Sequence, residues 1–172
     1  MLRSMAWMLL AAASAAGAED APATEPPPTL CDALPAFAAW VRPASIVAAP
    51  RADRGPLPRM TMGQAAAVTL SPAQDLVPVV APRRTGGPLA YAGLLRVHAP
   101  VTGTYRFALS GPVWLDVVDR GVSAASVAHG HGPECGPIRK LVDLPLTAGD
   151  HVVQIAAAPT PNVEIMGVRV VP

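Results

Sequence analysis

The sequence has 172 residues, a length that suits one domain and excludes a large multidomain enzyme. Apolar residues make up 51% of it, aromatic residues 4% and charged residues 15%, and its 21 prolines disfavour long helices. The 13 basic and 12 acidic residues leave a formal net charge of +1, which provides no electrostatic footprint for nucleic acid or an anionic membrane surface. We therefore expect no nucleic-acid partner.

Residues 1–18 have the layout of a cleavable export signal. A single charge at Arg3 precedes an apolar run over residues 5–16, and the small residues Ala-Gly-Ala at 16–18 fit a signal-peptidase site. The apolar run is shorter than the ~20 residues that span a bilayer. We expect cleavage after Ala18, a mature chain without a transmembrane segment, and a periplasmic or secreted protein.

Residues 19–64, which follow the predicted export signal, divide into a leader and an arm. Residues 19–29 are acidic and rich in proline, so they predict a disordered leader. Residues 30–64 predict an arm that contains one short helix starting near Pro35, because apolar residues recur there at helical spacing. Prolines and glycines interrupt residues 42–64, which predicts mostly loop, and Trp40 is expected in the core.

From residue 65 to residue 172 short β-type runs alternate with turn residues. The candidate strands cover residues 65–71, 75–81, 89–99, 104–110, 113–119, 122–129, 138–146, 151–158 and 163–171. Compact connections at residues 119–121 and 147–150 predict hairpins, which favours antiparallel pairing. The predicted fold class is all-β, an antiparallel two-sheet β-sandwich of jelly-roll or Greek-key type with one short N-terminal helix.

Two cysteines, Cys31 and Cys135, fall in the predicted mature chain. An exported protein experiences an oxidising compartment, which favours a disulfide between them. That bridge would tie the arm to the distal half of the chain, with an idealised stabilisation of roughly 4 to 5 kcal/mol. The alternative is that one thiolate ligates a metal.

The densest group of potential metal ligands is the glycine-rich stretch HGHGPECGP. Residues two apart on a strand face the same way, so His129 and His131 could both reach one metal. Glu134 would supply a carboxylate, and His151 or His98 a distant third imidazole. Two imidazoles and a carboxylate form the ligand set of a facial iron site. The alternative interpretation is a connection between strands in which the imidazoles hydrogen-bond to the turn backbone.

Trp114 and Asp116 form a second candidate site. They share one face of the strand predicted at residues 113–119 and could line a shallow groove for a sugar or a peptide. In the alternative interpretation Trp114 covers a second apolar layer while Asp116 caps a neighbouring turn. The basic pairs at residues 83–84 and 139–140 are interpreted as solvated charges.

The stretch GTYRFALSGPVWLDVVDRG, followed by LPLTAGDHVVQI, resembles protective-antigen-type and other carbohydrate-associated β-sandwiches over residues 103–155. This resemblance implies a β-sandwich fold. Such modules usually carry consecutive aspartates for calcium-assisted sugar binding, whereas this sequence has Trp114-Leu115-Asp116 at that place. The resemblance therefore implies the architecture rather than the calcium-dependent activity.

A second resemblance combines the export signal with CDALPAFAAW, GTYRFAL and HGHGPECGPIRKLVDLPL. Together they are similar to a group of small exported bacterial proteins, some of which carry the name homogentisate 1,2-dioxygenase. That name implies an iron-dependent dioxygenase, although the enzymes to which it belongs are longer, intracellular proteins of the cupin fold.

These patterns together predict an exported, non-catalytic β-sandwich that acts as a monomer and binds an envelope component or a carbohydrate without a cofactor. The serines lack the nucleophile elbow of a hydrolase, and the sequence contains no phosphate-binding or dinucleotide glycine motif. The alternative is a small protein that binds copper, zinc or iron through the His-Gly-His stretch. An iron-dependent dioxygenase of the homogentisate type is the least favoured form of that alternative.

Overall fold

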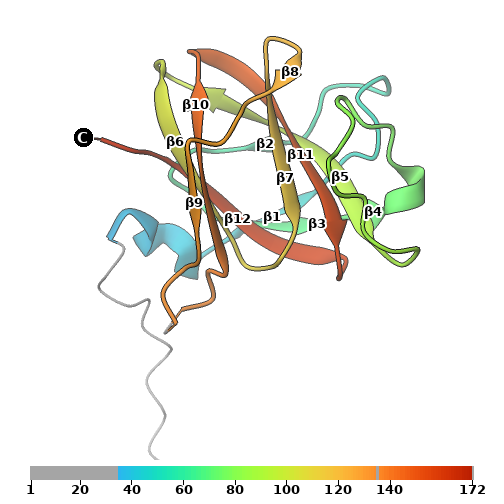
Figure 1. Ribbon diagram of the computed structural model, residues 1–172, viewed down its shortest axis with the longest axis horizontal. Helices are drawn as coiled ribbons and strands as arrows, with labels where there is room; N and C mark the ends of the chain where they lie inside the picture. The colour runs from blue at the N-terminus through green and yellow to red at the C-terminus, as the bar shows by residue number, and fades with distance from the viewer. Residues whose placement is uncertain (1–34, 135, 172) are drawn as a thin grey trace, which may run out of the picture.

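The computed structural model describes residues 35–134 and 136–171. The predicted export signal, the leader and both cysteines lie outside the described residues, and with them the predicted disulfide. In the described part, two short 3-10 helices accompany a set of strands (Figure 1). The elements are η1 (Pro35–Val41), β1 (Ala44–Val47), β2 (Arg59–Met60), β3 (Ala66–Thr69), β4 (Ser71–Pro72), η2 (Ala73–Asp75), β5 (Tyr91–Ala99), β6 (Gly103–Leu109), β7 (Trp114–Asp119), β8 (Val122–Ser123), β9 (Ala128–Gly130), β10 (Lys140–Leu146), β11 (Gly149–Ala158) and β12 (Asn162–Arg169).

The strands form two sheets that pack face to face, which confirms the predicted all-β sandwich (Figure 1). The first sheet has the order β1-β3-β12-β6-β10-β9, and the second has the order β2-β5-β11-β7-β8, with β4 also paired to β5. Most neighbours are antiparallel, as predicted. Two pairs at the sheet margins, β1 with β3 and β2 with β5, are parallel, so both sheets are mixed.

The arm of residues 30–64 contributes these two marginal strands where the sequence predicts mostly loop. β1 and β2 are short, and each begins directly after a proline, Pro43 and Pro58. A proline, which has no amide hydrogen to donate, is tolerated at the start of a strand at the margin of a sheet. The predicted helix is present as η1, which begins at Pro35.

The second predicted strand, residues 75–81, is a loop instead. It runs across the second sheet, where the buried side chain of Gln154 on β11 binds its backbone. Pro78 lies in its middle and cannot donate a hydrogen bond to a neighbouring strand. Val77 and Val79 of this loop are exposed, so its apolar run has the sequence pattern of a strand without the burial of one.

The two compact connections have different outcomes. The turn at residues 119–121 joins β7 and β8 as a hairpin, with Asp119 opposite Val122 and positive φ angles of 50° at Arg120 and 84° at Gly121. The predicted hairpin at residues 147–150 is wrong, because β10 and β11 lie in different sheets. This connection arches between the sheets, and hydrogen bonds to the ends of neighbouring strands stabilise the arch.

The main core lies between the sheets and is built from aliphatic residues with a few aromatic ones. A smaller cluster covers the outer side of the first sheet, where Phe37 and Trp40 of η1 pack against Ala108, Ile138 and Met166. Trp40 is 3% exposed, which confirms its predicted place in the core. Among the residues that the structure describes, no helix has the length and apolar character needed to cross a membrane.

Candidate functional site

A cleft of about 670 Å³ opens where β7 and β10 begin, at one end of the sandwich. A second cleft of about 430 Å³ adjoins it, and the two share Trp114, His129 and Lys140. The first cleft is lined by Arg84, Ser110, Pro112, Val113, Trp114, His129, Gly130, His131, Arg139 and Lys140. These residues come from both sheets and from the loop before β5, so the cleft exists only in the folded chain.

Trp114 has a half-buried indole that two contacts hold in place, and a third contact anchors the lysine that makes one of them. Its Nε1 donates a hydrogen bond of 2.9 Å to Oδ2 of Asp116. The Nζ of Lys140 lies 5.3 Å from the centroid of the indole ring, a distance suited to a cation–π interaction. The same Nζ donates a hydrogen bond of 2.9 Å to the carbonyl of Val113. The exposed part of the indole is therefore presented to the cleft in one orientation.

Asp116 supports the indole from below. Its side chain is 5% exposed, and its Oδ1 accepts a hydrogen bond of 2.7 Å from Ser123 Oγ on β8. The Nε2 of Gln154 approaches Oδ2 at 3.5 Å. The structure thus brings Trp114 and Asp116 together on one face of β7, as predicted, and commits both carboxylate oxygens to protein donors. A role of either residue in ligand binding stays a prediction.

Gln154 links Asp116 to the loop that carries Arg84. Its Oε1 accepts a hydrogen bond of 2.8 Å from the amide of Val79, and its Nε2 donates one of 2.8 Å to the carbonyl of Val80. Gln154 is fully buried, so these bonds are partly shielded from water although Val79 itself is exposed. The loop is therefore fixed a few residues before Arg84 reaches the cleft.

Positive charge dominates the lining of the first cleft. Arg84, Arg139 and Lys140 contribute positive charges, and within the described part of the chain the lining contains no aspartate or glutamate. Burial lowers the pKa of Lys140, the positive charge of Arg84 lowers this pKa further, and Asp116 acts in the opposite direction. The charged form of Lys140 is thus less stable in the cleft than that of a free lysine in water, so an anion that binds there would stabilise it.

The structure places His129 and His131 on the same cleft, and both side chains are exposed. His129 lies on β9, the strand at the margin of the first sheet, opposite Val142. Glu134 is exposed and is not part of the lining, and Cys135 lies outside the described residues. Of the predicted metal ligands near this stretch, the structure therefore brings together the two imidazoles.

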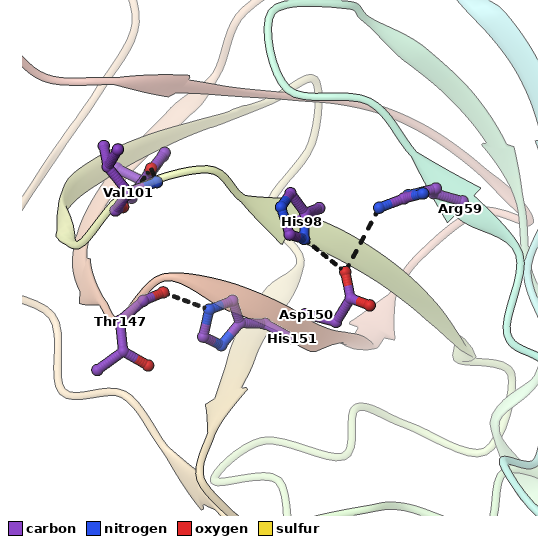
Figure 2. Close-up of polar contacts among 7 residues, drawn as sticks. Arg59, His98, Val101, Thr147, Asp150 and His151 are labelled. Atoms are coloured by element: carbon purple, nitrogen blue, oxygen red, sulfur yellow. Dashed lines mark hydrogen bonds and ion pairs between the residues drawn. The ribbon is translucent and has the colours of Figure 1, made fainter.

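The other two candidate histidines lie elsewhere (Figure 2). His98 on β5 contacts Asp150, with 2.8 Å between Nδ1 and Oδ1. His151 is buried, with its Nε2 2.8 Å from the carbonyl of Thr147 and its Nδ1 3.6 Å from Oδ1 of Asp119. Asp119 ends β7 and Trp114 begins it, so ~16 Å of strand separate His151 from the cleft. Within the described residues, no group of three or more His, Cys, Asp and Glu side chains is arranged to hold a metal ion.

Sequence reasoning missed the cationic part of this site. It interpreted Arg84, Arg139 and Lys140 as solvated charges, because nothing in their local sequence connects them with Trp114. One pattern could have identified Lys140, since it is the charged exception in the alternation of Ile138, Lys140, Val142 and Leu144. A lysine at an inward position of a strand needs a partner, and here the partners are an indole and a backbone carbonyl.

The fold and the site together define the class as a β-sandwich with an aromatic and cationic surface cleft. No protein-family model matches this sequence, and no curated protein matches it. The resemblances to carbohydrate-associated sandwiches and to small exported bacterial proteins therefore stand on the motifs of the sequence.

Proposed function

We propose that this protein is an exported, non-catalytic module that binds a saccharide in the cleft at Trp114. The observation that carries the proposal is the half-exposed indole of Trp114, which Asp116 and Lys140 hold in a fixed orientation beside polar side chains. An aromatic surface takes up the apolar face of a sugar ring, and neighbouring polar groups pair with its hydroxyls. Because the indole is ordered before binding, the ligand does not have to supply that ordering free energy.

The small number of carboxylates in the described linings favours saccharide binding over hydrolysis. Enzymes that hydrolyse glycosidic bonds commonly use a pair of carboxylates on either side of the bond. Counting the described residues only, the lining of the first cleft contains no carboxylate, and that of the second contains Asp116 alone. Asp116 already accepts hydrogen bonds from Trp114 and Ser123, so its carboxylate fixes the orientation of the indole.

The predicted export signal at residues 1–18 supports a location outside the cytoplasm. The resemblance to carbohydrate-associated sandwiches supports a saccharide as the ligand. A periplasmic or secreted module of this kind would encounter cell-envelope polysaccharide. The proposal needs no cofactor and no nucleic-acid partner.

Intrinsic fluorescence of the mature chain tests this function. Removal of residues 1–18 leaves Trp40 and Trp114 as the tryptophans of the sequence, the first buried and the second facing the cleft. Titration with a panel of neutral and acidic oligosaccharides should give a saturable change in emission. The change should persist in Trp40→Phe and vanish in Trp114→Ala. If no member of the panel changes the emission, or if Trp114→Ala responds like the wild type, the proposed function is wrong.

Metal binding is the second candidate function, because His129 and His131 line the same cleft. The positive charges of Arg84, Arg139 and Lys140 raise the electrostatic cost of a divalent cation there, which favours the saccharide proposal. Copper, zinc and iron should be measured in the mature protein and in a His129→Ala, His131→Ala double variant. Stoichiometric metal that disappears in the variant would replace the saccharide proposal by this alternative.

A further inference from the structure

The charges of the first cleft differ from those of the chain as a whole. The sequence is close to neutral, with 13 basic and 12 acidic residues. Among the residues that the structure describes, the lining of the cleft nevertheless combines Arg84, Arg139 and Lys140 with two histidines and no carboxylate. Folding has therefore gathered cations from two segments that are distant in sequence, Arg84 and the pair Arg139-Lys140, onto one surface.

Some arginines elsewhere in the described part of the chain are paired with carboxylates, whereas others, such as Arg54, are not. Arg51 pairs with Asp53, Arg59 with Asp150, and Arg106 holds Asp143 through two hydrogen bonds of 2.7 Å. In the described part of the chain, no such ion pair is found for the three cations of the cleft. Their positive charge is thus available to a ligand.

The carboxylate of Asp116 offsets this positive charge only in part, because burial and Arg84 lower the pKa of Lys140 despite the opposing effect of Asp116. Asp116 lies under the indole, and its oxygens accept hydrogen bonds from Trp114 Nε1 and Ser123 Oγ. Lys140 points instead over the indole ring and to the carbonyl of Val113. An anion that binds Lys140 from the cleft is consequently held beside the indole, within reach of a sugar ring that packs on it.

We propose that the saccharide bound in this cleft is acidic. Its oxyanion, a carboxylate or a sulfate ester, lies among Arg84, Arg139 and Lys140, while the sugar ring packs against the exposed part of Trp114. Guanidinium groups bind both kinds of oxyanion through paired hydrogen bonds, which explains the use of arginine at two of the three positions. This inference rests on the proposed function and adds the charge of the ligand.

Four matched probes test the inference by fluorescence and calorimetric titration of the mature chain. Tetragalacturonate carries carboxylates, its fully methyl-esterified form has the same rings without charge, a sulfated galactose tetrasaccharide carries sulfate esters, and hexaglutamate carries carboxylates without sugar. We expect at least one acidic saccharide to bind at least ~10-fold more tightly than the ester and the peptide, because several charged contacts act together. Its binding should weaken as salt is added.

The outcomes separate the inference from the proposed function. If the methyl ester binds as tightly as the acidic saccharides and its binding depends on Trp114, the proposed saccharide binding holds and the inference of an acidic ligand is overturned. Equal binding of hexaglutamate shows that the cleft selects charge rather than sugar, which also overturns the inference. If none of the four probes binds, the inference is overturned, and the wider panel described above then decides the proposed function on its own. Whichever of the two acidic saccharides binds identifies the source of the oxyanion.

Charge variants connect the binding to the cleft. Arg84→Gln and Arg139→Gln change exposed side chains, so the fold should be retained, and each should weaken binding of the acidic saccharide by about 3- to 10-fold. Lys140→Gln should have at least as large an effect, and Lys140→Arg should restore part of it. Arg54→Gln, an exposed arginine outside the cleft, is the matched control. Wild-type affinity in both arginine variants of the cleft would overturn the inference.

Discussion

The indole Nε1 of Trp114 donates a hydrogen bond of 2.9 Å to Asp116, two residues further along the same strand. Residues at this spacing share one face of a strand, so β7 alone supplies both the indole and the carboxylate that holds it. Ser123 on β8 and Gln154 on β11 then hold the carboxylate from the two neighbouring strands. Three neighbouring strands of the second sheet, β8, β7 and β11, therefore fix the orientation of the indole through Asp116.

Loss of the Asp116 carboxylate should loosen the indole without unfolding the sheet. In a Trp40→Phe background of the mature chain, where Trp114 is the sole tryptophan, Asp116→Ala should increase quenching of the emission by acrylamide. Alanine removes the acceptor of the Trp114 Nε1 hydrogen bond, whereas asparagine could still accept from Trp114 while it donates to Ser123. Asp75→Ala, at an exposed position on η2, is the control. Unchanged quenching would show that the hydrogen bond does not fix the indole.

Gln154→Leu should release the loop at Val79 and Val80. The change removes the acceptor for the Val79 amide and the donor to the Val80 carbonyl, and each lost hydrogen bond contributes about 0.5 to 1.5 kcal/mol. We expect faster hydrogen exchange at the Val79 amide and a lower free energy of unfolding. Gln74→Leu, an exposed position, should leave both unchanged. If exchange at Val79 stays slow, some other contact holds the loop.

The stretch that carries His129 and His131 should respond very differently to alanine at its two glycines. A Cβ at Gly132 would collide with the backbone carbonyl of Ile138, whereas a Cβ at Gly130 would meet no atom within 4 Å. Gly132→Ala should lower stability by roughly 1 to 3 kcal/mol, measured by urea denaturation, because the clash involves backbone that has to move. Gly130→Ala should be close to wild type. Equal stability of the two variants would contradict this packing.

Asp119 should make stability depend on pH in the acid range. Burial by itself would raise the pKa of Asp119, but hydrogen bonds from Thr147, with His151 and Arg120 nearby, hold this pKa below its ordinary value. A carboxyl group whose pKa is lower in the folded state stabilises the fold above its unfolded pKa of about 3.9, and that stability is lost as the pH falls through the folded pKa.

The test is the free energy of unfolding of Asp119→Asn, measured from pH 7 to below pH 3. This variant should be less stable than wild type at pH 7 by about 1.5 to 3 kcal/mol, the usual contribution of hydrogen bonds to a charged group. Because it lacks the titrating carboxyl, its stability should fall less steeply below about pH 4. Asp75→Asn is the control. Parallel curves for wild type and Asp119→Asn would remove Asp119 as a source of acid sensitivity.

The sequence by itself determined the class of fold and several local features. Alternating apolar residues on β6 and β10, the proline at the start of η1 and the glycine after Arg120 act within a few residues, so local conformational preference settles them. The shared face of Trp114 and Asp116 follows from the two-residue period of a strand in the same way.

Only the tertiary structure decided which strands meet and what lines the cleft. The arch at residues 147–150 and the loop at residues 75–81 depend on partners far along the chain, such as Gln154, which is 75 residues from Val79. The contact between Lys140 and Trp114 likewise joins strands of different sheets. Such contacts form because the burial of the whole apolar core brings the strands together, and no local pattern encodes which charged side chains then become neighbours.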